Sequence, residues 1–208
     1  MLHTNTLPVH SLELLKKLAP VLTPHGFHLA GGTALALRLG HRISVDLDFF
    51  SPNPFQTESI ISVLEDAAGE SARVFQQTTG SLSVTIAGTK IELFHYIYPL
   101  LSETEMHQGV TMASLADNGA MKLSALTNRG SKKDFYDISR LLDIEPLNYW
   151  LGKFQEKYPN SDLFMVLKSL TWFDDAEAEP EPLLLDGQSW SSVKSKLTSA
   201  IAQLNGDT

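Results

Sequence analysis

A run of alternating apolar and acidic residues sets the first constraint on the fold of this 208-residue chain. Between Ser44 and Phe50, apolar residues take every second position, and Asp46 and Asp48 lie between them. A period of two is typical of a β-strand, so the pattern predicts a strand with both carboxylates on one face. Aspartate is depleted in strands, and like charges on one face repel unless a cation lies between them. Magnesium takes one or two protein carboxylates and completes its shell with water and substrate phosphates, so the pair indicates phosphoryl-type chemistry on a nucleotide.

A glycine pair precedes this strand, between a predicted short strand at residues 27–30 and a predicted helix at residues 33–39. Gly31 and Gly32 let the backbone approach a ligand closely, and the amide groups at a helix start favour anions. Thr33 adds a hydroxyl that could contact a phosphate. A tight strand-to-helix turn without a ligand explains the same residues. The pair favours a phosphate site only in combination with the acidic strand that follows.

Glu92 is the candidate for a third carboxylate. Residues 81–98 alternate between apolar and polar positions on both sides of Gly88 and Thr89, which predicts a hairpin. On its second strand, Glu92 lies on the polar face. If this strand pairs suitably with the first acidic strand, three carboxylates surround one or two metal ions. A solvent-facing residue paired with Lys90 explains Glu92 equally well.

Basic and acidic side chains also gather near the middle of the chain, at Lys122, Arg129, Lys132, Lys133, Asp134 and Asp137. Lys122 and Arg129 are seven residues apart on a predicted helix, so they share a face. In one interpretation, surface ion pairs worth about 0–1 kcal/mol each hold two helices together. In the other, Lys122 meets nucleotide phosphates and the acids orient the basic groups. The spacing favours neither.

The secondary-structure pattern changes from mixed strands and helices to helices alone at about residue 100. The remaining predicted helices span residues 11–20, 58–68, 115–128 and 133–142, and the chain beyond Pro146 is mostly helical. We therefore predict an α+β fold, with a catalytic core over residues 1–105 and a helical C-terminal domain over residues 106–208.

Composition excludes several classes of protein. The chain has no cysteine, so disulfides, thiolate metal sites and a cysteine nucleophile are excluded. A net charge of −8 argues against a protein whose main task is non-specific nucleic-acid binding. No apolar run approaches the roughly 20 residues that span a bilayer, and the N-terminus lacks the regions of a signal peptide. We expect a cytoplasmic protein that does not enter a membrane.

The motifs together resemble the AbiEii/AbiGii toxin family, which belongs to the DNA-polymerase-β-like nucleotidyltransferase superfamily. The segment from Gly31 to Asp48 is similar to the first motif of the family, and the segment from Lys132 to Asp137 is similar to its distal helical signature. The resemblance covers residues 25–145. It implies a nucleotidyltransferase-like core with a small mixed β-sheet flanked by helices, followed by a helical C-terminal part.

The resemblance also implies roles for individual residues. Nucleotide-binding residues would be Gly31, Gly32, Thr33, Ser44 and Lys122. The carboxylates that hold Mg²⁺ would be Asp46 and Asp48, with Glu92 as third ligand. Catalytic residues would be Asp46, Asp48, Glu92, Lys122 and Asp134. Glu92 departs from the superfamily pattern, because many members carry aspartate at this position.

The expected function is Mg²⁺-dependent transfer of a nucleoside monophosphate (NMP) from a nucleoside triphosphate (NTP) to an acceptor hydroxyl. Family members act as toxins in type IV toxin–antitoxin or phage-defence systems, and some transfer nucleotides to tRNA ends. Expected partners are therefore an NTP, an RNA acceptor such as tRNA, and an antitoxin encoded nearby. Two alternatives stay open: a non-catalytic nucleotide-binding or interaction module of the same fold, and a nucleotidyltransferase that modifies small molecules such as antibiotics.

Overall fold

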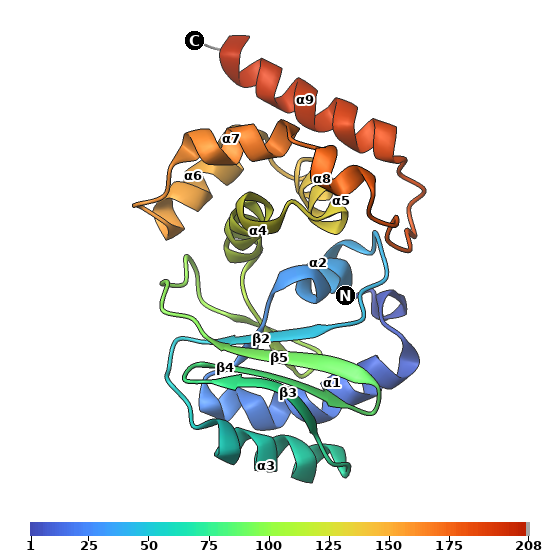
Figure 1. The fold of residues 1–208 in the computed structure, drawn as a ribbon, viewed down its shortest axis with the longest axis vertical. Helices are drawn as coiled ribbons and strands as arrows, with labels where there is room; N and C mark the ends of the chain where they lie inside the picture. Colours follow the sequence, from blue (N-terminus) through green and yellow to red (C-terminus); the bar gives the residue numbers. More distant parts are fainter. Residues whose placement is uncertain (207–208) are drawn as a thin grey trace. The chain divides into compact units, whose positions relative to one another are not determined.

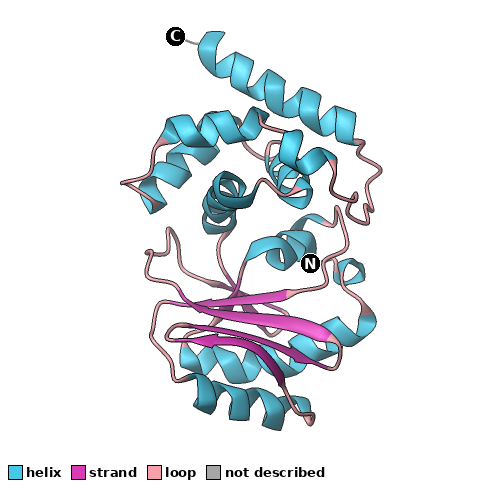
Figure 2. Ribbon diagram, viewed as in Figure 1, coloured by secondary structure: helices cyan, strands magenta, loops and turns pink. Residues whose placement is uncertain are grey.

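The computed structural model describes residues 1–206 and divides them into two compact units, one ending at Ser114 and one beginning at Leu115. The first unit combines a β-sheet with helices, and the second is helical apart from its loops (Figure 2). The predicted α+β architecture with a helical C-terminal part is confirmed. The division falls later than the expected boundary after residue 105, because the two strands that follow this position join the sheet of the first unit. No helix in residues 1–206 is long and apolar enough to cross a membrane.

The first unit contains a mixed sheet and the helices that cover it. Its helices are η1 (Thr4–Thr6), α1 (Val9–Leu22), η2 (Thr23–His25), α2 (Gly31–Leu39) and α3 (Thr57–Ala68). Its strands are β1 (His28–Leu29), β2 (Leu47–Ser51), β3 (Arg73–Thr78), β4 (Ser81–Ile86), β5 (Thr89–His95), β6 (Glu105–His107) and β7 (Val110–Met112). Among the described residues, the strand order is β3-β4-β5-β2-β1-β7-β6. The pairs β2–β5 and β1–β7 are parallel, and the other neighbours are antiparallel.

Helices α1 and α3 cover one face of the sheet, and α2 lies on the other side (Figure 1). The buried residues of the two central strands are Leu47, Phe49, Ile91 and Leu93. They join the leucines of α1 in one hydrophobic core. Because side chains alternate along a strand, Asp48 and Glu92 belong to the opposite face. Burial of the apolar positions therefore determines which face carries the acids.

Several element boundaries differ from those predicted. Helix α1 continues through Pro20 to Leu22, since a proline in the last turn removes only one hydrogen bond and buried leucines anchor that turn. Strand β2 begins at Leu47, three residues later than predicted. The β4–β5 hairpin turns at Ala87 and Gly88, whose φ angles are 48° and 77°, one position earlier than predicted.

The second unit consists of packed helices. They are α4 (Leu115–Arg129), α5 (Lys132–Leu141), α6 (Leu147–Lys157), α7 (Leu163–Thr171), α8 (Asp174–Glu177) and α9 (Trp190–Gly206). Gly119 lets α4 approach α6 closely, because a Cβ at this position would collide with the Trp150 ring. The Trp150 Nε1 donates to the backbone oxygens of Leu141 (3.1 Å) and Glu145 (2.9 Å), which ties α6 to the end of α5.

Candidate functional site

Asp48 and Glu92 lie on adjacent parallel strands of the first unit. Strand β2 pairs with β5 in a register that places Asp48 beside Glu92. Asp46 lies just outside the strand, immediately before Leu47, and both aspartates are partly buried. Neighbouring strands are about 4.8 Å apart, so paired side chains on one face can interact. The structure thus brings Asp48 and Glu92 together and places Asp46 at the start of the same strand.

The glycine turn meets the side chain of Asp48. Gly31 has a φ of +70°, and a Cβ there would lie 3.0 Å from Asp48 Oδ2. The backbone N–H of Ala30 donates to the Asp48 backbone oxygen at 3.0 Å. Helix α2 begins at Gly31 rather than Thr33, so Gly32 lies in its first turn, and its N-cap residue is Ala30. Helix starts favour anions, so this turn places an anion-favouring backbone directly beside a carboxylate.

Thr33 and Ser44 connect the glycine helix to the segment that leads into β2. The Thr33 hydroxyl donates to Ser44 Oγ at 2.8 Å and to the backbone oxygen of Asp46. Thr33 is 1% exposed and Ser44 is 8% exposed. In this structure, the Thr33 hydroxyl therefore holds the Asp46 segment in position, whereas the sequence pattern led us to expect it on a phosphate.

Glu92 is paired with a lysine rather than gathered with the aspartates. Lys90 Nζ lies 3.0 Å from Glu92 Oε1. Burial alone would lower the pKa of Lys90, but its hydrogen bond to Glu92 and the charges of Glu92, Asp46 and Asp48 raise that pKa above its usual value. Within residues 1–206, no three acidic or histidine side chains are grouped closely enough to hold an ion. The expected three-carboxylate cluster is therefore not assembled in this structure.

The donor set of the two aspartates nevertheless fits a magnesium ion. Two carboxylates are the number that Mg²⁺ usually takes from a protein, because waters and substrate phosphates supply its other ligands. A side chain at position 31 would crowd this carboxylate, because a Cβ there would lie 3.0 Å from Asp48 Oδ2. Asp46 and Asp48 are thus the residues that could hold the ion.

The distal acidic and basic residues form a buried charge network in the second unit. Lys122 Nζ lies 2.8 Å from both Asp134 Oδ1 and Asp137 Oδ2. Arg129 donates to Asp134 through Nε (2.7 Å) and Nη2 (2.9 Å). Both aspartates are 0% exposed, so of the two open interpretations the one of surface ion pairs is wrong for this network. Burial opposes ionisation of Asp134, but Lys122 and Arg129 outweigh it and lower the Asp134 pKa below its usual value.

Lys132 does not belong to an open basic surface. Its Nζ donates to the backbone oxygen of Glu179 at 2.6 Å and lies 5.3 Å from the centre of the Trp190 ring. The residue is 5% exposed. Lys132 thus anchors the segment after α8, whereas Arg129 is accessible, with a side chain 52% exposed.

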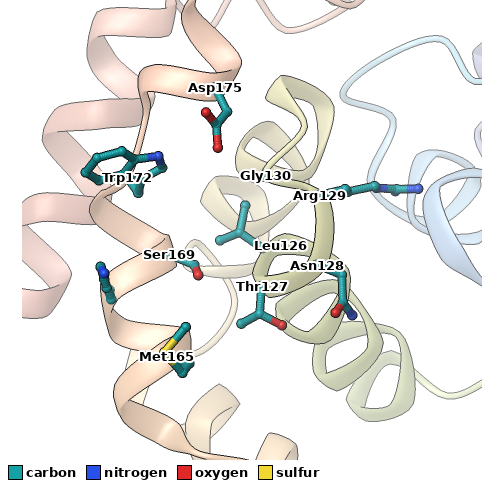
Figure 3. Close-up of a pocket in the computed structure, with 10 residues that line it drawn as sticks. Leu126, Thr127, Asn128, Arg129, Gly130, Met165, Ser169, Trp172 and Asp175 are labelled. Carbon is teal, nitrogen blue, oxygen red and sulfur yellow. The ribbon is translucent and has the colours of Figure 1, made fainter.

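A cavity of about 270 Å³ lies within the helical unit, between α4 and the segment from α7 to α8. Ser169 and Asp175 point toward α4 across this cavity, and Arg129 points away from it (Figure 3). Its lining residues are Leu126, Thr127, Asn128, Arg129, Gly130, Met165, Lys168, Ser169, Trp172 and Asp175. None of the proposed metal ligands contributes to it.

Sequence reasoning named Lys90 as an alternative partner of Glu92 but missed its place near the two aspartates. A signal was present, because Lys90 is two residues from Glu92 and period two places both side chains on one strand face. The parallel register of β2 and β5 was not readable from the sequence, and this register is what brings Lys90 near the aspartates.

Comparisons with known proteins identify relatives of the whole chain. Residues 13–200 match a family described as nucleotidyl transferase AbiEii toxin of type IV toxin–antitoxin systems. The uncharacterized protein aq_aa25 of Aquifex aeolicus (strain VF5) is 38% identical over 176 residues, which cover 80% of this chain and 83% of that protein.

Two solved structures share the fold. JHP933 from Helicobacter pylori has a TM-score of 0.63 at 16% identity, over 95% of this chain and 91% of that chain. MenT4, a nucleotidyltransferase toxin from Mycobacterium tuberculosis H37Rv, has a TM-score of 0.58 at 14% identity, over 95% of this chain and 86% of that chain. At these identities, the likeness extends to the fold alone.

Proposed function

The chain belongs to the AbiEii family of nucleotidyl transferase toxins of type IV toxin–antitoxin systems, and on that premise we propose that it transfers NMP from an NTP to an acceptor hydroxyl with Mg²⁺ as cofactor. Membership confirms the predicted family and enzyme class. It also implies a nucleotide substrate and an antitoxin partner.

One observation carries the proposal: the side chain of Asp48 lies against the first turn of α2 at Gly31. A magnesium–triphosphate complex needs carboxylate oxygens for the ion and backbone amide groups for the phosphates. The Gly31–Gly32 turn supplies the second requirement, and Asp46 and Asp48 supply the first. The Gly31 turn and the Asp48 carboxylate are direct neighbours, because a Cβ at Gly31 would lie 3.0 Å from Asp48 Oδ2.

In the proposed reaction, the acceptor hydroxyl oxygen forms a bond to the α-phosphorus of the NTP. The bond from that phosphorus to the bridging oxygen of pyrophosphate breaks, and the hydroxyl proton passes to a base. When bound, Mg²⁺ would neutralise charge on the phosphates. Asp46 and Asp48 would hold the ion with Glu92 as third ligand, and Thr33 and Ser44 would keep the Asp46 segment in place. The turn at the start of α2 would bind the triphosphate.

By the family resemblance, we propose that Lys122 contacts a nucleotide phosphate and that Asp134 positions it. The support for this role is the network that fixes the ammonium, since Asp134 and Asp137 both lie 2.8 Å from Lys122 Nζ. A lysine ammonium is a compact charge on a flexible stem, so two carboxylates are needed to hold it in one place.

The proposed acceptor is an RNA hydroxyl, such as one at a tRNA end, and the proposed compartment is the cytoplasm, where NTPs and RNA are both present. The acceptor follows from the family resemblance. Arg129 supports it, because its side chain is half exposed and could contact an RNA phosphate despite the acidic total charge.

The test is incubation of the purified chain with each α-labelled NTP, MgCl₂ and a cell RNA extract. We expect label on a discrete RNA. Asp46→Asn and Asp48→Asn should lower transfer at least about a hundredfold, because a metal ligand contributes several kcal/mol to such a reaction. Each variant should keep the melting temperature of the wild type within a few degrees, since both aspartates are only partly buried.

Asp66→Asn is the matched control, because Asp66 is an exposed aspartate on α3. It should transfer at the wild-type rate. Full activity in Asp46→Asn or Asp48→Asn would contradict the metal assignment. Label on a small molecule would keep the chemistry and replace the acceptor, and NTP binding without turnover would favour a non-catalytic module.

A further inference from the structure

Lys90 lies on the same face of the sheet as the acidic residues Asp46, Asp48 and Glu92. On β5, Lys90 and Glu92 are two residues apart, so their side chains share a face. Strand β2 pairs with β5 from Leu47 beside Ile91 onward, and the residues just before this pair are Asp46 and Lys90. Lys90 therefore lies across from Asp46 on the neighbouring strand, as Glu92 lies across from Asp48.

The lysine offsets part of the negative charge on this face of the sheet. Three carboxylates on one sheet face repel each other at the spacing of neighbouring strands. Lys90 is a cation that offsets part of this repulsion: its Nζ lies 3.0 Å from Glu92 Oε1, and the charges of Asp46 and Asp48 also act on it. The ammonium thus supplies positive charge to the same three carboxylates that a divalent ion would need.

The Lys90 ammonium is also able to move away from the carboxylates. The Lys90 side chain is 47% exposed, whereas the Glu92 side chain is 27% exposed. A lysine carries its charge at the end of a flexible four-carbon stem and can turn its head group into water at low cost. A fixed cation such as a buried arginine would lack this freedom.

We propose that Lys90 is a positioning residue that competes with the divalent ion for the acidic face. Lys90 offsets part of the charge of the three carboxylates and keeps Glu92 on β5; when the ion binds, the ammonium turns to solvent and releases Glu92 to join Asp46 and Asp48. This inference rests on the proposed metal site and adds an exchange between a side chain and a metal ion. It also explains why Glu92 is paired with Lys90 rather than grouped with the aspartates.

The test is calorimetric titration of the full chain with MnCl₂ and, separately, MgCl₂. Lys90→Met removes the charge and keeps most of the length of the side chain. We expect it to bind Mn²⁺ about tenfold more tightly than the wild type, because a positive charge beside the ion is gone. Without added metal, the melting temperature of Lys90→Met should fall, and saturating MgCl₂ should restore it. Lys90→Arg keeps the charge and should bind Mn²⁺ with wild-type affinity.

Lys153→Met is the matched control, because Lys153 makes an ion pair of similar length, 2.8 Å to Glu156 Oε2, on a helix surface. Its Mn²⁺ affinity should equal that of the wild type. Lys90→Met is also made in a chain that carries Glu92→Gln, which separates the effect of removing the lysine charge from the effect of releasing Glu92. In that chain, Lys90→Met should raise the Mn²⁺ affinity by less, because the side chain at position 92 no longer adds a charged ligand. An undiminished gain would overturn the release of Glu92.

The outcomes separate this inference from the function on which it rests. Unchanged or weaker Mn²⁺ binding by Lys90→Met, with normal binding by the wild type, would overturn the competition and leave the metal site intact. A wild-type chain that binds neither ion would overturn the metal site and the competition together. If Lys90→Met fails to fold by circular dichroism, Lys90→Gln is titrated under the same criteria.

Discussion

At the level of single residues, the contact between Gly31 and Asp48 constrains the proposed site. Gly31 has a left-handed backbone and leaves no room for a Cβ, which would lie 3.0 Å from Asp48 Oδ2. Gly69, at the end of α3, has a similar φ of +76°, but a Cβ there would meet no atom within 4 Å. The two glycines share a backbone conformation and differ in their surroundings.

Alanine at each position separates these two effects. Both Gly31→Ala and Gly69→Ala should lose about 1–2 kcal/mol of unfolding free energy through backbone strain, measured by urea denaturation. Gly31→Ala should in addition lower NMP transfer at least about tenfold, because its Cβ displaces a carboxylate that holds the ion. Equal transfer by the two variants would show that the Gly31 contact does not position Asp48.

At this scale, the sequence predicted the residues that meet but not all of their partners. The spacing from Gly31 to Asp48 was sufficient to predict a glycine turn beside an acidic strand. The partner of the Thr33 hydroxyl was not predictable, because it depends on how the segment before β2 folds back on α2. The ion pair of Glu92 with Lys90 was one of two open interpretations, and only the folded structure distinguishes them.

At the scale of elements, the helical unit depends on charges that are buried between helices. Lys157 of α6 pairs with Asp117 of α4 at 2.7 Å, and both side chains are 0% exposed. Such a pair adds little stability over a well-packed apolar pair, but removal of one partner leaves an uncompensated charge.

The Asp117–Lys157 pair makes a direct prediction. Asp117→Asn should lower the unfolding free energy by about 3–5 kcal/mol, because the Lys157 ammonium stays buried without its carboxylate. The double variant Asp117→Asn/Lys157→Met should recover part of this loss. Urea denaturation of the full chain measures both. A single-variant loss below about 1 kcal/mol would mean that water reaches this pair.

The charge network around Asp134 predicts how the stability of the fold depends on pH. Because the folded pKa of Asp134 is lowered below its ordinary value of 3.8, its ionised form stabilises the fold fully above that pH. This contribution is lost as the pH falls through the folded pKa. The stability difference between the wild type and Asp134→Asn should therefore be constant from pH 7 to 5 and shrink only below about pH 3.8. A difference that already disappears near pH 5 would contradict the pairing.

The elements that the sequence did not predict share a physical cause. Strand β3 is exposed at every position from Arg73 to Thr78, so it lacks the buried alternate positions that mark a strand. Strands β6 and β7 contain three residues each, too few for a period to be visible. The long helices and the β4–β5 hairpin were predictable, because their apolar positions recur where burial requires them.

At the scale of the whole molecule, the change from mixed elements to helices alone correctly predicted an α+β chain with a helical C-terminal part. The division into two units falls after Ser114 because β6 and β7 pair with the sheet beside β1. Local sequence could not show this, since the pairing of β1 with β7 joins residues more than eighty positions apart. Family membership adds what the fold alone does not supply, a nucleotidyltransferase that acts as a toxin.

The central claim is that the chain transfers the α-phosphoryl group of an NTP together with its nucleoside. The most direct measurement incubates the chain with MgCl₂, cell RNA and the same NTP labelled either on the α-phosphorus or on the γ-phosphorus. We predict that the α-label appears on an RNA acceptor, that the γ-label appears only in pyrophosphate, and that Asp48→Asn loses the first signal. Transfer of the γ-label to an acceptor, or transfer of neither label to any acceptor in the extract, would contradict the account.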